Sequence, residues 1–203
     1  KNSVSLYGLS AKIKGVFHEF FPITKTKSNE NDQESNLTID NKYSSKEEIE
    51  GAYNYYRQML QFWGPTKVSG FLKHAKELAL NANKENCNVF TVLTIITDGL
   101  IVDLHDIVQS VFGMEKVPIF IVFVGIGEEK SDRGFLSLKQ IDDNLNEMKQ
   151  NGEDENIFND IVKFAHFKTE NLVEKSSFSK DLFQEIPDEV ARFMNQRSNK
   201  EEL

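Results

Sequence analysis

The segment NVFTVLTIITDG, residues 88–99, gives the clearest indication of the fold of this chain. Every residue from 89 to 96 is apolar or threonine, and β-branched residues dominate. A strand that does not alternate between apolar and polar residues is buried on both faces, as in the middle of a parallel sheet covered by helices. Residues 117–126, VPIFIVFVGI, repeat this pattern. The two stretches therefore predict two central strands of a parallel sheet.

Helical spacing over residues 103–113 joins these strands into a strand–helix–strand crossover. The segments before and after these two strands show the spacing of apolar residues typical of helices and strands. Together they predict a doubly wound, mostly parallel α/β domain with helices on both faces. The other expected strands are 4–11 and 16–21, as an antiparallel hairpin, and 160–167. The other expected helices begin near Lys46, after Pro65, at 134 and at 178, the last with a kink or break at Pro187. Residues 24–45 are polar and predict a flexible loop without secondary structure.

Composition excludes several functions. The chain has 203 residues and a net charge of −8, which argues against nucleic-acid binding. No apolar run reaches the roughly 18 residues that a membrane-spanning helix needs. The single cysteine, Cys87, rules out a disulfide framework and a cysteine-based zinc site, and it fits a reducing compartment. The first residue is Lys1, which suggests a fragment of a longer protein.

Asp98 is the main candidate for a functional residue, because it directly follows the most buried strand. Ligands of doubly wound sheets bind outside the carboxyl ends of the strands. Asp98 could form a turn with Gly99 and cap the next helix. It could instead bind a hard cation such as Mg²⁺, with the Thr66 hydroxyl as a second oxygen ligand. Position alone leaves both interpretations open.

Other candidates carry weaker signals. Gly125 and Gly127 resemble a phosphate-binding loop, but no helix is expected directly after them, so a turn at the end of the strand is favoured. The four histidines show no metal-binding spacing. Trp63 fits core packing at a helix end better than a partner surface. No catalytic constellation emerges, and we expect a protein that is not an enzyme.

Several segments together resemble the copine branch of the von Willebrand factor A domains. The resemblance covers nearly the whole chain, as one N-terminally incomplete domain over 1–203, apart from the polar loop. It rests on these segments: YGLSAK (7–12), VFHEF (16–20), GPT (64–66), VLTIITDGLIVD (92–103), VPIFIVFVGIG (117–127), DIVKFAHF (160–167) and LFQEIPDEVARF (182–193).

The resemblance implies a metal-ion-dependent adhesion site that binds Mg²⁺ or Mn²⁺. The family builds this site from an Asp-x-Ser-x-Ser-like segment, a loop threonine and a later aspartate. Position by position, the threonine is Thr66 and the aspartate is Asp98. The first segment has no counterpart here, so we expect weak or absent metal binding by this fragment. The family's strand order also places the missing first strand between residues 4–11 and 89–96, where upstream residues or a partner chain would supply it.

The implied function is protein–protein interaction, with an acidic residue of a partner completing the metal's coordination. In copine-like proteins, Ca²⁺ acts through two phospholipid-binding modules that are absent from this chain. The expected location is the cytoplasm, with calcium-dependent recruitment to membranes. Two alternatives remain: the A domain of a copine-like RING ubiquitin ligase, and a scaffold that has lost metal binding.

Overall fold

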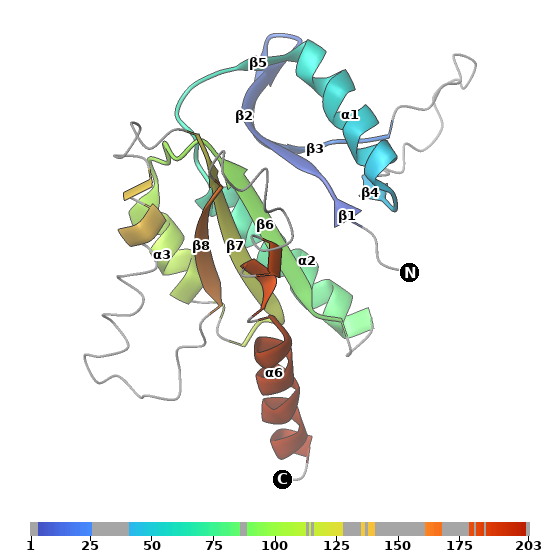
Figure 1. The fold of residues 1–203 in the computed structure, drawn as a ribbon, viewed down its shortest axis with the longest axis vertical. Helices are drawn as coiled ribbons and strands as arrows, with labels where there is room; N and C mark the ends of the chain where they lie inside the picture. Colours follow the sequence, from blue (N-terminus) through green and yellow to red (C-terminus); the bar gives the residue numbers. More distant parts are fainter. Residues whose placement is uncertain are drawn as a thin grey trace. The chain divides into compact units, whose positions relative to one another are not determined.

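The computed structural model describes residues 4–25, 41–85, 89–112, 114, 116–127, 135–136, 138–140, 161–167, 179–180, 182–184 and 186–201. Figure 1 shows the elements of the chain. They form two compact units, unit 1 (Lys1–Lys67) and unit 2 (Val68–Leu203). In the described part of the chain, no helix is long and apolar enough to cross a membrane.

Unit 1 contains a small antiparallel sheet in the order β3-β2-β5. The hairpin expected near the N-terminus is confirmed: β2 (Tyr7–Ile13) pairs with β3 (Val16–Pro22). Lys14 and Gly15 form its two-residue turn with φ angles of 49° and 83°, and positive φ at both central residues suits the twist of a hairpin. β5 (Leu60–Phe62) adds a strand on the other side of β2. This last strand was not expected from the helical spacing.

The helix α1 (Lys46–Met59) packs on the end of β3. The Phe21 ring stacks on Tyr56 of α1, with ring centroids 6.1 Å apart. The Tyr56 hydroxyl accepts the Thr24 backbone N–H at 3.1 Å. The short strands β1 (Val4–Ser5) and β4 (Lys42–Tyr43) also pair. β4 corrects the expectation of a loop without secondary structure over 24–45, although residues 26–40 lie outside the described residues.

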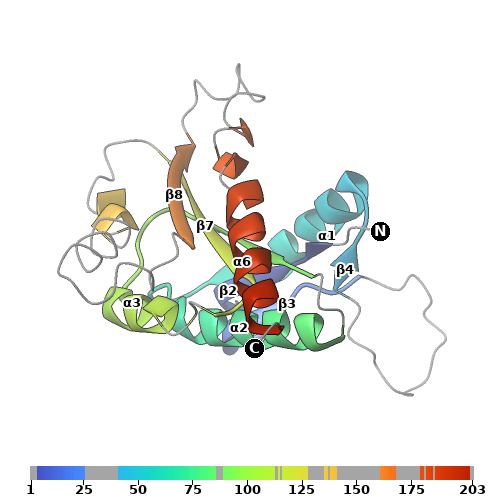
Figure 2. The same cartoon turned by 90° about the horizontal axis from the view of Figure 1, so that it is seen from below.

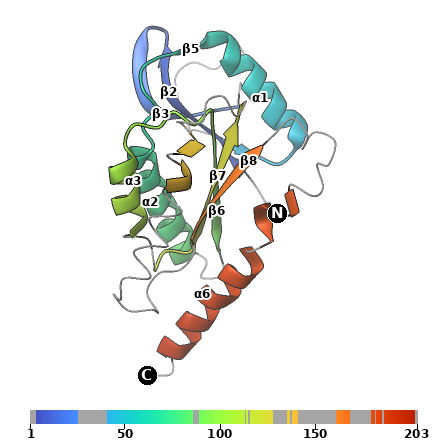
Figure 3. The same ribbon diagram turned by 60° about the vertical axis from the view of Figure 1, so that its left-hand side comes forward.

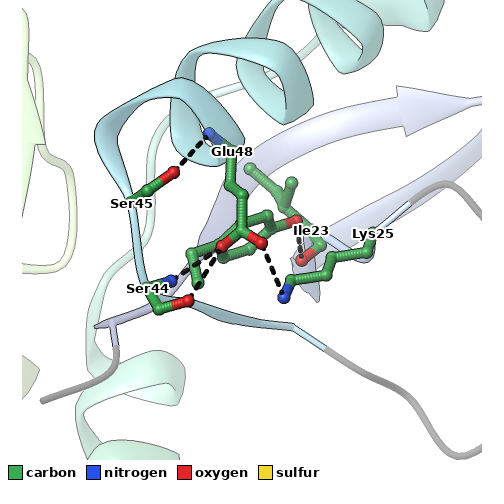
Figure 4. Close-up of polar contacts among 6 residues, drawn as sticks. Ile23, Lys25, Ser44, Ser45 and Glu48 are labelled. Atoms are coloured by element: carbon green, nitrogen blue, oxygen red, sulfur yellow. Dashed lines mark hydrogen bonds and ion pairs between the residues drawn. The ribbon is translucent and has the colours of Figure 1, made fainter. Parts of the chain in front are cut away.

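Two side chains cap the N-terminus of α1: that of Ser45, just before the helix, and that of Glu48, in its first turn (Figure 4). Ser45 is the N-cap residue, and its hydroxyl accepts the Glu48 backbone N–H at 3.2 Å. The Glu48 carboxylate reaches back and accepts the Ser44 backbone N–H at 2.8 Å, and it pairs with Lys25 at 3.3 Å. This arrangement is close to a capping box, in which the two side chains satisfy backbone donors that the helix itself leaves free.

We expect acid to weaken this cap. The Ser44 N–H, assisted by Lys25, lowers the pKa of Glu48 below its ordinary value of 4.5. A carboxyl with a lowered folded-state pKa stabilises the fold above its unfolded pKa, and the stabilisation is lost as the pH falls through the folded pKa. Hydrogen exchange of the Ser44 amide should therefore accelerate, relative to its intrinsic rate, as the pH falls below 4.5. Glu48→Gln should remove this dependence, and Glu47→Gln should preserve it. An identical pH profile in the Glu48 variant would contradict the cap.

Unit 2 contains the parallel sheet that the apolar stretches predict. Its order is β6 (Thr91–Thr97), β7 (Ile119–Ile126) and β8 (Val162–Phe167), all parallel. β7 lies in the middle and is buried along its length except at Ile126. The aligned row Thr97, Gly125 and His166 stands near the carboxyl ends of the three strands.

One face of this sheet carries α2 (Ser69–Glu85) and α3 (Leu104–Phe112), which pack against each other (Figures 2 and 3). On the other face, α6 (Ile186–Glu201) begins beside the sheet and runs on past the ends of the strands (Figures 1 and 3). On that side, Leu182 and Ile186 contact Phe120 and Val122 of β7. Unit 2 is therefore a mixed α/β structure built around a parallel sheet, as the sequence predicted.

The expectation that residues 89–96 are buried on both faces was wrong for one face. Val92 is 42% exposed and Ile96 is 64% exposed. Both lie on the face where β7 carries Phe120 and Val122, since Val92 pairs with Phe120 in register. The cover from Leu182 and Ile186 reaches β7 and does not extend over this part of β6. Among the described residues β6 is an edge strand, and it does not pair with β2.

The remaining elements agree with their predictions in outline. Pro187 is the second residue of α6, a position in the first turn where proline removes no helical hydrogen bond, so it marks a helix start and not a kink. The helix expected over 134–149 lies largely outside the described residues, although 135–136 and 138–140 are helical. Cys87 also lies outside them.

Candidate functional site at the carboxyl end of the sheet

Asp98 directly follows β6, at the end of the sheet where doubly wound folds bind ligands. The turn after it is made by its neighbours. Gly99 has φ of 102°, and its N–H donates to the Thr97 hydroxyl at 3.1 Å. Asp98 is exposed, and within the described part of the chain its carboxylate has no hydrogen bond or ion pair.

The helix-capping role considered for Asp98 is not what the structure shows. α3 begins at Leu104, and its first helical bond runs from the Ile107 N–H to the Asp103 carbonyl at 3.0 Å. Asp103 is thus the residue at the helix start, five positions beyond Asp98. The Asp98 carboxylate remains available for a ligand.

Thr66, the second predicted ligand, forms an isolated β-bridge near the end of unit 1, two residues after a bend at Gly64. Gly64 has φ of 74°, a left-handed conformation that favours glycine. The Lys67 N–H donates to the Ser10 hydroxyl of β2 at 3.3 Å, which ties the segment after Thr66 to the hairpin. Thr66 is half-buried. Because Thr66 belongs to unit 1 and Asp98 to unit 2, their joint role as metal ligands stays a prediction.

Asp103 has a role that the sequence did not reveal. It stands at the start of α3, and its side chain caps α2. Its carboxylate accepts the Val68 N–H at 3.1 and 3.0 Å and the Ser69 N–H at 2.9 Å. Val68 stands at the N-cap of α2, where its carbonyl accepts the Leu72 N–H, and it has no side-chain acceptor of its own. A residue 35 positions away therefore supplies the cap.

This cap joins the segment before α2 to the segment before α3, both within unit 2. Asp103 is buried, and its charge faces the N-terminal amides of α2, where the helix dipole favours an anion. No local pattern could have indicated this contact, since the N-cap position of α2 is occupied by valine.

The other candidates have structural roles where they are described. Gly125 lies inside β7 and not in the turn that we expected. A Cβ there would stand 2.4 Å from Cε1 of Phe135, so glycine makes room for that ring. His166 Nε2 lies 3.0 Å from the Gly127 carbonyl oxygen, and its ring packs on Phe135. Among the described residues, no group of three His, Cys, Asp or Glu side chains could hold a metal.

A parallel α/β sheet with an exposed aspartate at its carboxyl edge fits the von Willebrand factor A-like class that the sequence resembles. Comparison with known proteins gives the family. The family model described as Copine matches residues 20–202. Nicotinic receptor-associated protein 1 of Caenorhabditis briggsae is 23% identical over 159 residues, which are 73% of this chain and 24% of that protein. Copine-F of Dictyostelium discoideum is 27% identical over 137 residues, 66% of this chain and 24% of that protein.

The chain belongs to the copine family. Copine domains are protein-interaction modules, so the coarse function predicted from the sequence is confirmed at that level. The matched part of each relative is about a quarter of its length.

Proposed function

We propose that this chain recruits partner proteins without catalysing a reaction, through an adhesion-type metal site that includes Asp98 and Thr66. The observation that carries the proposal is the exposed, unengaged carboxylate of Asp98 at the carboxyl end of β6. Neither the following turn nor the next helix uses this carboxylate. A charged group kept free at this edge of a parallel sheet is suited to binding a ligand.

The donor chemistry fits a hard cation. A carboxylate and a hydroxyl oxygen are the ligand types that Mg²⁺ and Mn²⁺ accept. Two such residues are fewer than an octahedral ion needs, so further oxygen ligands must come from other segments or from water. When bound, the ion would offer a coordination position to an acidic side chain of a partner. The chain's own contribution is to hold the Asp98 loop, through Gly99 and Thr97, and the Thr66 loop, through Ser10.

For the whole protein, we propose a cytoplasmic location and calcium-dependent recruitment to phospholipid membranes through modules outside this chain. The name of the Caenorhabditis briggsae relative states an association with a nicotinic receptor. This name supports a protein as the partner of the present chain as well. A metal-independent scaffold and a ubiquitin-ligase context are the alternatives.

The test is a pull-down with the full-length protein, in Mg²⁺ or in a chelator. We compare the wild type with Asp98→Ala and with Asp106→Ala, an exposed aspartate on α3 that serves as the matched control. Partner recovery should fall roughly tenfold or more in chelator and in Asp98→Ala, because truncating a direct ligand removes the bridging interaction. Asp106→Ala should behave as the wild type. Equal recovery in all conditions would support the scaffold instead.

A further inference from the structure

The turn end of the β2–β3 hairpin, with the neighbouring end of β5, exposes a group of large apolar side chains. Phe62 is 83% exposed, Val16 60%, Trp63 51% and Phe17 48%. Phe17 pairs with Lys12 and lies on the same face of the sheet, whereas Val16 pairs with Ile13 and Phe62 with Ala11, on the opposite face. Exposed apolar side chains that gather on one face commonly mark an interaction site. We call Lys12, Lys14, Phe17 and Trp63 the aromatic–basic end of unit 1.

Strand pairing holds these residues together. Lys12 pairs with Phe17 on one side and with Gln61 on the other, while Ile13 pairs with Val16 and Leu60. The Lys12 ammonium lies 3.1 Å from the centroid of the Trp63 ring. A cation over an indole face is attracted by the ring, so this contact fixes Trp63 on the hairpin. The aromatic surface is therefore held in place before any partner binds.

The charge around this end differs from that of the whole chain. Residues 10–18 and 57–68 contain no Asp or Glu, and they contribute four cations: Lys12, Lys14, Arg57 and Lys67. The Lys67 backbone is bonded to Ser10, which places this lysine beside β2. Yet the chain as a whole carries −8. The first acidic residue along the hairpin is Glu19 of β3.

We propose that the aromatic–basic end binds an acidic segment of a partner protein, and that this segment also contains an aromatic or aliphatic side chain as an anchor. This proposal rests on the proposed role of the chain in recruiting partner proteins. Trp, Tyr and Arg are the side chains that most often dominate binding energy at protein interfaces, and Phe is enriched there. Complementary charge steers such a segment to this end and sets its orientation. An anionic membrane fits less well, because its wide surface would meet the net charge of −8, whereas a peptide meets only the local cations.

Trp63 is the only tryptophan of the chain, so its fluorescence reports directly on this surface. The probe is a short synthetic peptide in which Asp and Glu flank Phe and Leu, with no tryptophan. Its companion has the same Phe and Leu but carries Asn and Gln. The titration contains a chelator, so that it is independent of the metal site. The acidic peptide should shift Trp63 emission to the blue and protect it from acrylamide quenching, with an effect that weakens as salt is added.

Variants locate the binding. Lys14→Glu combined with Lys67→Glu reverses two cations and leaves the Lys12–Trp63 contact intact. This variant should bind a labelled acidic peptide roughly tenfold or more weakly. The control Lys42→Glu changes an exposed lysine on β4, which pairs with β1 ahead of the start of β2, and it should bind as the wild type.

Three results would overturn the proposal. The first is no fluorescence change with the acidic peptide. The second is an equal response to the neutral peptide. The third is a response to phosphatidylcholine vesicles containing phosphatidylserine, without a response to the peptide, which would assign the surface to a membrane. The titration does not depend on Mg²⁺. The metal-dependent partner site could therefore be disproved while peptide binding at the aromatic–basic end is still observed, and the reverse also holds.

Discussion

Replacing Asp103 with alanine should lower the stability of unit 2 by about 2–3 kcal/mol, because the change leaves backbone donors at the start of α2 without an acceptor. The Asp103 carboxylate accepts the N–H groups of Val68 and Ser69, and Val68 is fully buried. Water cannot readily replace the lost acceptor at such a position. Urea denaturation followed by far-ultraviolet circular dichroism measures the loss, and hydrogen exchange at Val68 and Ser69 locates it.

Two controls separate this cap from a general effect of charge. Asp103→Asn keeps one oxygen acceptor but loses the charge, so its cost should lie between those of the wild type and the alanine variant. Asp106→Ala removes an exposed carboxylate three residues away and should change stability by no more than about 0.5 kcal/mol. Equal stability of the Asp103 and Asp106 alanine variants would show that the cap contributes nothing.

Gly125→Ala should destabilise unit 2 by about 1–3 kcal/mol through overpacking. The added Cβ would stand 2.4 Å from Cε1 of Phe135 and 3.3 Å from Cε2 of Phe164. Phe135 cannot easily move, since its ring also packs against His166 with centroids 4.4 Å apart. Thermal unfolding measures the effect.

The matched glycine is Gly51, which lies in α1 with nothing within 4 Å of an added Cβ. Gly51→Ala should raise stability by about 0.5–1 kcal/mol, because alanine favours the helix. The two alanine variants should thus have opposite signs. A gain in stability from Gly125→Ala would mean that the Phe135 ring does not depend on this glycine.

The local sequence was enough to predict strands that are marked by an apolar run and the hairpin that is closed by a tight turn. The unbroken apolar run of β7 indicated a central parallel strand, and the Lys14–Gly15 turn closes the hairpin expected around it. The position of Asp98 at the carboxyl end of β6 was also predicted, since it follows from where the apolar run stops.

Features that depend on distant contacts could not be predicted. The apolar pattern of β6 does not show that the cover on one face stops at β7. The Asp103 cap joins residues 35 positions apart, and the sequence near α2 gives no sign of it. Gly125 looked like a turn glycine because the ring that needs its space, Phe135, lies beyond the end of the strand. Short strands such as β4 and β5 depend on pairing with β1 and β2 and not on their own composition.

The most direct test of the central claim, that Asp98 belongs to a metal-dependent partner site, is Mn²⁺ binding by the full-length protein. Electron paramagnetic resonance measures free Mn²⁺ during a titration of the wild type, Asp98→Ala and Asp106→Ala. We expect Asp98→Ala to lose one Mn²⁺ site or to bind at it roughly tenfold or more weakly, while Asp106→Ala keeps the wild-type curve. Identical Mn²⁺ curves for the wild type and Asp98→Ala would contradict the assignment of Asp98 as a metal ligand.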